Sequence, residues 1–236
     1  MMGSCLRLIV TTTAKIAIER LAVNGWTHCL ASLRLPVADL VRALGYAGSK
    51  IQPLPMAKDL RPRDTGGARP GSMSSKIGLS EQPFHTDGAF RITPPRHLIF
   101  ECLDPGEVLC STEIWALNWV RLIHDRPTIL REPPWLVRQS RSAAFYTQVL
   151  ACTGTTGGLI RFDPCCMVPV QEAVEVGRET MAAIECYSRL VQIDWAIGDV
   201  LVIDNWRCLH RRADATRSPS RCLRRWELGG SLGLVG

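Results

Sequence analysis

The sequence has no apolar run long enough to cross a membrane, which takes about 20 consecutive apolar residues. The most apolar early stretch, Leu6 to Ile18, is interrupted by Arg7 and Lys15. This stretch also lacks a clean apolar segment followed by a small-residue cleavage site, so we do not expect a signal peptide. The sequence therefore predicts a cytoplasmic protein with no membrane partner.

Paired cysteine motifs are also missing. The chain has ten cysteines, but none stand in a Cys-x-x-Cys arrangement, and the adjacent Cys165 and Cys166 do not match the spacing of zinc ligands. Several cysteines lie in apolar segments, where a thiol behaves as a small hydrophobic side chain. We interpret them as reduced, buried thiols, which argues against a secreted domain stabilised by disulfides.

Aromatic residues make up only 6% of the chain and do not alternate with basic residues as they do on single-stranded nucleic-acid platforms. The net charge is +6, but 22 acidic residues are mixed with the 28 basic ones. The arginines gather in a Pro/Gly-rich segment and between Arg207 and Arg225. Because a guanidinium group matches a carboxylate, small anionic ligands explain these clusters better than nucleic acid, which is not an expected partner.

The length of 236 residues suits one domain with a sizeable core, and the 46% hydrophobic and 21% charged residues are an ordinary globular balance. No repeat or linker divides the chain, so we expect a single domain over residues 1–236. Residues 1–50 are predicted to be mostly helical. Residues 52–80 are rich in proline and glycine, which predicts a long irregular loop at the active site.

The periodicity of apolar residues predicts both helices and strands. Helices are expected from Val37 to Leu44, Glu113 to His124 (capped by Ser111 or Thr112) and Gln171 to Leu190. Strands are expected at His97–Cys102, Ala143–Leu150, Leu159–Phe162, and in a hairpin of Ile193–Ala196 with Val200–Ile203. Strands dominate the second half, which indicates a mainly β domain with flanking helices.

One group of residues has the composition of a metal site. His85 and Asp87 are two residues apart in an extended segment, so their side chains point to the same face. His210 lies beyond the apolar strand Val200–Ile203 and offers a second imidazole. Two histidines and one carboxylate on one face of an octahedron leave open positions, as in non-haem Fe(II) oxygenases. A His-x-Asp pattern alone is common, so its surroundings matter.

Those surroundings carry a resemblance. The segments His85-Thr86-Asp87, Pro94-Pro95-Arg96 and Gly198-to-His210 resemble the taurine dioxygenase (TauD/TfdA) family of Fe(II)/2-oxoglutarate oxygenases, over about residues 25–226. The resemblance implies a double-stranded β-helix (jelly-roll, cupin-like) core. It also implies that His85, Asp87 and His210 are the catalytic iron ligands and that 2-oxoglutarate and O2 are co-substrates.

The same resemblance implies two binding groups for the far carboxylate of 2-oxoglutarate. Arg221 follows His210 by eleven residues, and Thr112 follows His85 by 27, where the family has its arginine and hydroxyl partners. A surface arginine and a helix cap are the alternatives. Arg225 matches the arginine that grips the substrate anion in taurine dioxygenase, with Arg224 as a competitor, because a one-residue slip of a strand exchanges its faces.

The expected activity is oxidation, by hydroxylation in the first place, of a C–H bond in a small carboxylate-bearing molecule such as an amino acid or natural-product precursor, with release of succinate and CO2. Asp87 stands where halogenating relatives have a small residue, so halogenation is not expected. Arg211-Arg212 replaces the family's usual Gly-Arg. The alternatives are a non-catalytic jelly-roll binding protein, a desaturase or cyclase with the same iron site, a zinc hydrolase and a nucleic-acid demethylase.

Overall fold

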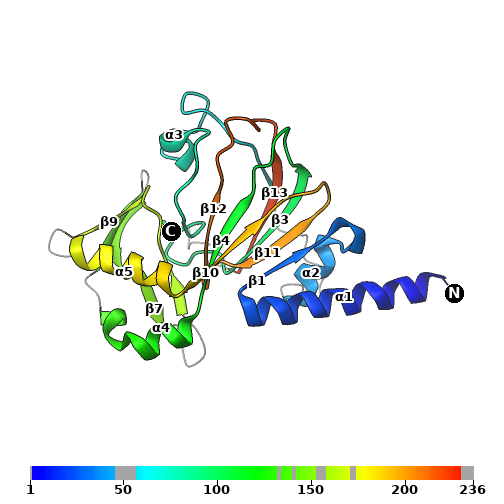
Figure 1. Ribbon diagram of the computed structural model, residues 1–236, viewed down its shortest axis with the longest axis horizontal. Coiled ribbons are helices and arrows are strands. Elements are labelled where there is room, and N and C mark those ends of the chain that lie inside the picture. The colour runs from blue at the N-terminus through cyan, green and yellow to red at the C-terminus, as the bar shows by residue number, and fades with distance from the viewer. Residues whose placement is uncertain are drawn as a thin grey trace.

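The computed structural model describes residues 2–45, 57–131, 134–139, 142–152, 158–170 and 174–229, and its centre is a pair of antiparallel sheets (Figure 1). The five-stranded sheet has the order β1 (Trp26–Cys29), β11 (Val200–Asp204), β3 (His97–Asp104), β13 (Cys222–Leu228), β2 (Lys58–Leu60). The three-stranded sheet has the order β10 (Ser188–Ile193), β4 (Thr112–Leu117), β12 (Cys208–Arg212). An isolated antiparallel bridge joins His85 to His210 and extends the smaller sheet beyond β12.

The core of the domain lies on both faces of β11. Leu201 and Ile203 point between the two sheets, where they pack in a cluster with Ile114 of β4. Val200 and Val202 point to the other face, toward the N-terminal helices. All five residues of β11 are buried, which explains why the first four, Val200 to Ile203, form a continuous apolar run rather than an alternating one.

The N-terminal helices cover the outer face of the large sheet (Figure 1). They are α1 (Met2–Asn24) and α2 (Val37–Ala43), with β1 and the 3-10 helix η1 (Ala31–Leu33) between them. Ala14, Ala17 and Leu21 of α1 pack in one cluster with Val202 of β11 and Trp226 of β13. Within the described residues, no helix combines the length and the apolarity needed to cross a membrane.

A second layer lies beside the smaller sheet, on the left of Figure 1. It contains the sheet β6 (Ser142–Thr147), β5 (Trp135–Gln139), β9 (Met167–Pro169) and the pair β7 (Leu150–Cys152), β8 (Gly158–Ile160). Its helices are α4 (Trp119–Asp125), η2 (Pro127–Arg131) and α5 (Val174–Cys186). Leu122 and Ile184, both fully buried, pack these helices into a common core with Leu209 of β12.

The predicted helix from Glu113 to His124 is wrong in its first half. Residues 112–117 form β4, whose side chains alternate between the two faces, and the helix α4 begins only at Trp119. The predicted cap by Ser111 or Thr112 is wrong as well, because the side chain of Asn118 accepts the backbone N–H of Arg121 at 3.0 Å. A short apolar run does not distinguish a helix from a strand.

The predicted hairpin of Ile193–Ala196 with Val200–Ile203 is also wrong. The strand β10 already begins at Ser188, inside the predicted helix of residues 171–190, and it pairs with β4. β11 instead pairs with β1 and β3. The Gly198-Asp199 turn therefore passes the chain from one sheet to the other, with Gly198 at a φ of 83° and the Asp199 carboxylate accepting the backbone N–H groups of Ala31 and Ala196.

The segment 52–80 is less irregular than predicted. Its described part, from residue 57, contains β2, which pairs with β13, and the short helix α3 (Met73–Ile77), capped by Ser72. The predicted strand Ala143–Leu150 is divided in the structure, because β6 ends at Thr147 and β7 begins at Leu150, whereas the predicted strand Leu159–Phe162 is found as β8. That residues 1–236 form one domain stays a prediction.

Candidate active site

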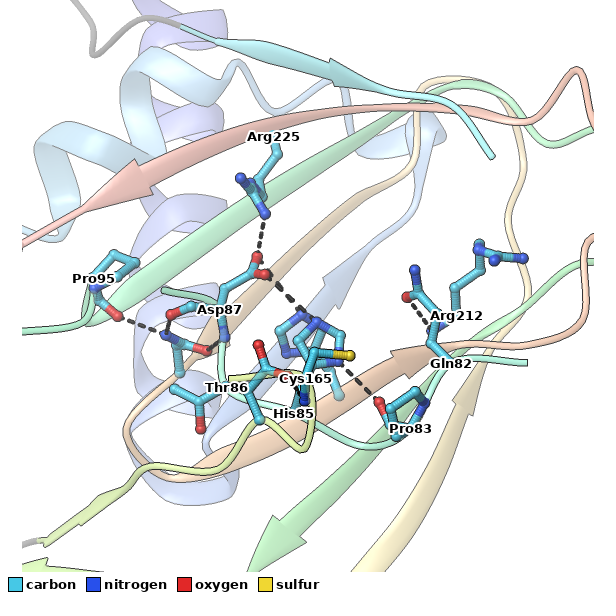
Figure 2. Close-up of polar contacts among 12 residues, drawn as sticks. Gln82, Pro83, His85, Thr86, Asp87, Pro95, Cys165, Arg212 and Arg225 are labelled. Carbon is cyan, nitrogen blue, oxygen red and sulfur yellow. Dashed lines mark hydrogen bonds and ion pairs between the residues drawn. The ribbon is translucent and has the colours of Figure 1, made fainter. Parts of the chain in front are cut away.

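Backbone pairing places the two predicted histidines side by side. The N–H of His85 donates to the carbonyl of His210, and the N–H of His210 donates to the carbonyl of His85, both at 3.0 Å. Residues paired in this way project their side chains from the same face of a sheet. Asp87 follows two positions later, and one ligand atom from each of the three side chains lies within 4.8 Å of the others (Figure 2).

The charge distribution in this triad suits a cation. Nε2 of His85 and Nε2 of His210 lie 3.5 and 3.8 Å from the Asp87 carboxylate oxygens, and the side chains of the triad are 7 to 13% exposed. Burial opposes the ionisation of Asp87, yet Arg225 and the two histidines hold its pKa well below the usual range. Burial also opposes protonation of His85, but Asp87 raises its pKa overall. Burial and the charge of His85 lower the pKa of His210 to about 3.

Neighbouring polar groups fix the His85 ring and the backbone of Asp87, whereas Nδ1 of His210 is buried and has no hydrogen-bond partner among the described residues. Nδ1 of His85 lies 3.0 Å from the carbonyl oxygen of Pro83, which only accepts, so Nδ1 carries a proton and Nε2 is the atom left to bind a metal. Asn205, fully buried, accepts the backbone N–H of Asp87 and donates to the carbonyls of Asp87 and Pro95 at 3.0 and 2.8 Å. We did not predict the role of Asn205 from the sequence.

The segment 78–95, which carries His85 and Asp87, is held by buried arginines as well as by Asn205. Arg212 donates to the carbonyls of Gly78, Leu79 and Ser80. Arg161 donates to the carbonyls of Ala89, Arg91 and Ile92. The Arg211 side chain points away from Arg212 and pairs with Glu81 and Glu113. The Arg211-Arg212 pair therefore fixes the segment beside the triad.

Thr112 and Arg221, predicted from their spacing, lie in contact. Ile114 of β4 is paired with His210, and Thr112 lies two residues before Ile114 on the same strand. The Thr112 side chain therefore lies on the same interior face as the triad. Nη2 of Arg221 donates to Oγ1 of Thr112 at 2.9 Å, and both residues are buried. Within the described part of the chain, no carboxylate pairs with Arg221, and its buried Nε has no partner. An unpaired buried charge is costly, so this arrangement favours an anionic ligand.

Arg225 faces the triad and Arg224 does not. Arg225 donates to Oδ2 of Asp87 (Figure 2). It also donates to Oε1 of Glu227, and among the described residues its buried Nε has no partner. Arg224 points to the opposite face of β13, where it pairs with Asp59 of β2 and is partly exposed. Of the two arginines that the sequence left in competition, Arg225 is the one that contacts the triad.

No protein-family model matches the chain, and no curated protein matches its sequence. Solved structures do match. The non-haem iron oxygenase OrfP, in complex with Fe and alpha-ketoglutaric acid, superposes with a TM-score of 0.55 and 21% identity over 73% of this chain and 56% of its own. An asparagine oxygenase has a TM-score of 0.54 and 16% identity over 93% of this chain and 91% of its own. PvcB from Pseudomonas aeruginosa has a TM-score of 0.60 and 18% identity over 91% and 79%.

These likenesses identify the fold. The chain is a mainly β protein with the double-stranded β-helix core of non-haem iron oxygenases, as the sequence predicted. It spans 51 to 56% of the length of the OrfP chains that it matches, and the identities of 16 to 22% are too low to carry over more than the fold.

Proposed function

We propose that this chain is an Fe(II)/2-oxoglutarate-dependent oxygenase of the TauD/TfdA type that hydroxylates a C–H bond of a small carboxylate-bearing molecule. The observation that carries the proposal is a buried His-Asp-His triad that shares one interior face with a buried arginine lacking any carboxylate partner in the described residues. The first group suits a divalent metal, and the second suits the far end of a dicarboxylate.

The residues of the triad fit Fe(II). Nε2 of His85, Nε2 of His210 and the Asp87 carboxylate would be the three protein ligands, and two histidines with one carboxylate are the donor set of non-haem Fe(II) oxygenases. A cation at this point would replace the proton that Asp87 favours on His85. A zinc hydrolase is the rival for the same triad, but it gives no role to Arg221.

Arg221 and Thr112 would receive the far carboxylate of 2-oxoglutarate. The guanidinium group offers a charge-assisted hydrogen bond, and the hydroxyl group offers a second donor. When bound, iron and 2-oxoglutarate together with O2 supply the oxidising power for the C–H bond, and succinate and CO2 leave. The protein's own part is to hold the reactants in register and to keep water away, which the burial of these side chains favours.

Arg225 supports an amino acid or a related carboxylate as the substrate. Its Nε is buried without a partner beside Asp87, so an anionic substrate group would complete its hydrogen bonds. Two of the matched structures point the same way, since OrfP was solved with L-Arg and the asparagine oxygenase with 3-hydroxyasparagine. Desaturation or cyclisation would use the same site, and the mass of the product distinguishes them from hydroxylation.

The test is succinate release from the purified protein with Fe(II), 2-oxoglutarate and O2, screened against amino acids and carboxylated natural-product precursors. We expect substrate-dependent succinate and a product heavier by one oxygen atom, both lost in His210→Ala. Arg224→Gln is the control, because Arg224 lies beside Arg225 on β13 but faces solvent and pairs with Asp59. If the protein binds 2-oxoglutarate but releases no succinate, it is a non-catalytic binding protein. If an activity persists without O2, the site belongs to a hydrolase.

A further inference from the structure

The hydroxyl group of Thr112 accepts two hydrogen bonds. Nε1 of Trp195 donates to Oγ1 of Thr112 at 3.0 Å, and Nη2 of Arg221 donates to the same oxygen at 2.9 Å. A hydroxyl group has two acceptor lone pairs and one donor hydrogen. With both lone pairs engaged by groups that only donate, the hydroxyl hydrogen is left to point at an acceptor.

Trp195 is held firmly in the position from which it donates. It follows β10, is 6% exposed, and packs between the two sheets with Leu98, Leu201 and Ile203. The next backbone N–H, that of Ala196, donates to the Asp199 carboxylate at 3.0 Å. The indole N–H can only donate, so in this pair the Thr112 oxygen must accept, and its hydrogen must point elsewhere.

We propose that Trp195 is a positioning residue of the co-substrate pocket, because its indole N–H commits the Thr112 hydroxyl to donate toward the far carboxylate of 2-oxoglutarate. This inference rests on the proposed function. Arg221 supplies the charge in that pocket, while the pair Trp195–Thr112 supplies a directed neutral donor. Removing the indole N–H frees one lone pair of Thr112, so its hydroxyl no longer points mainly at the ligand.

The alternative is that Trp195 is an aromatic core residue and nothing more. Trp195→Phe separates the two roles, because phenylalanine keeps most of the buried ring and removes the N–H. A purely structural defect would weaken every ligand of the site to the same extent. A positioning defect would weaken only ligands that carry the far carboxylate.

The experiment is calorimetric titration of the Mn(II)-loaded protein with 2-oxoglutarate and with 2-oxobutanoate, which has the same 2-oxo acid group but no second carboxylate. In Trp195→Phe we expect the Kd of 2-oxoglutarate to rise about three- to thirtyfold, in proportion to the partial loss of one hydrogen bond to a charged group. The Kd values of 2-oxobutanoate and of Mn(II) should stay as in the wild type. In a Thr112→Val background, Trp195→Phe should have no further effect on 2-oxoglutarate.

Trp226→Phe is the matched control, since Trp226 is equally buried but packs on the other face of the large sheet. An unchanged Kd of 2-oxoglutarate in Trp195→Phe, or equal weakening of both oxo acids, overturns the inference. If Trp195→Phe does not fold, the inference is tested by NMR spectroscopy of the wild-type protein. Its Trp195 indole N–H resonance, assigned through its contact with Thr112, must then shift with 2-oxoglutarate and not with 2-oxobutanoate. A wild type that binds neither acid refutes the proposed function itself.

Discussion

Replacing Arg221 by methionine should strongly weaken co-substrate binding without harming the apoprotein. Arg221 is 4% exposed, and in the described residues its side chain donates only to Thr112. Methionine fills a similar volume without the charge. Thr112 keeps its hydrogen bond from Trp195, so the substitution leaves no new polar group without a partner.

The burial of Arg221 affects the binding free energy of 2-oxoglutarate and the free energy of unfolding in different ways. Loss of a buried charged partner costs about 2–5 kcal/mol of binding free energy, which raises the Kd of 2-oxoglutarate by about thirtyfold to several thousandfold. Replacing a buried ionic group by an apolar one of similar volume is neutral or stabilises the folded state by about 1–4 kcal/mol. We therefore expect weaker binding of 2-oxoglutarate together with an unchanged or increased free energy of unfolding.

Urea denaturation of the metal-free protein and calorimetric titration of the Mn(II)-loaded protein measure the two quantities. Arg224→Met is the control, because the exposed pair of Arg224 with Asp59 is screened by solvent, contributes little to stability and lies outside the site. A destabilised Arg221→Met apoprotein with an unaltered Kd for 2-oxoglutarate would refute the reasoning, since Arg221 would then be a structural residue.

Three further predictions concern the metal, its support and pH. Fe(II) or Mn(II) at about a hundred times its Kd should raise the free energy of unfolding by about 2.7 kcal/mol, an increase that a chelator reverses and His85→Gln abolishes. Asn205→Asp replaces two donated hydrogen bonds by a buried charge, so metal affinity should fall about 10- to 100-fold and urea denaturation should show a less stable protein. Burial lowers the pKa of His97 to about 4, so the unfolded chain binds a proton first and stability falls as the pH falls below about 6.5. In urea denaturation of the apoprotein, the free energy of unfolding should fall between pH 7 and pH 5 by about 2 kcal/mol less in His97→Gln than in the wild type. An equal fall in the wild type and in the variant would contradict the assignment to His97.

The parts of the site that could be predicted from the sequence are those set by local spacing. His85 and Asp87 share a face because side chains alternate along an extended segment. The apolar run of β11 indicated a strand just before His210. Which strands pair could not be derived in this way, since β11 takes both of its partners from far earlier in the chain. The bridge between His85 and His210 is a result of that tertiary pairing.

The errors have equally local causes. Residues 113–117 combine apolar and polar side chains in an order that fits either period, and only pairing with β10 and β12 makes them a strand. Trp195 and Asn205 carried no sequence signal of their roles. A tryptophan in an apolar segment is usually a core residue, and an asparagine after a strand is usually a turn residue. Their hydrogen-bond partners, distant in sequence, reveal what they do.

The way in which segment 78–95 is fastened has a consequence for variant surveys. Besides backbone hydrogen bonds to β12, Phe162 and Ala215, the segment is held by the side chains of Arg161, Asn205 and Arg212. None of these three is a proposed ligand, yet each fixes the path of the backbone that presents His85 and Asp87. In genetic screens, substitutions of these three residues should therefore give the same loss of activity as substitutions of the proposed metal ligands. The cause differs, because they displace the backbone that carries the ligands and leave the ligands themselves intact.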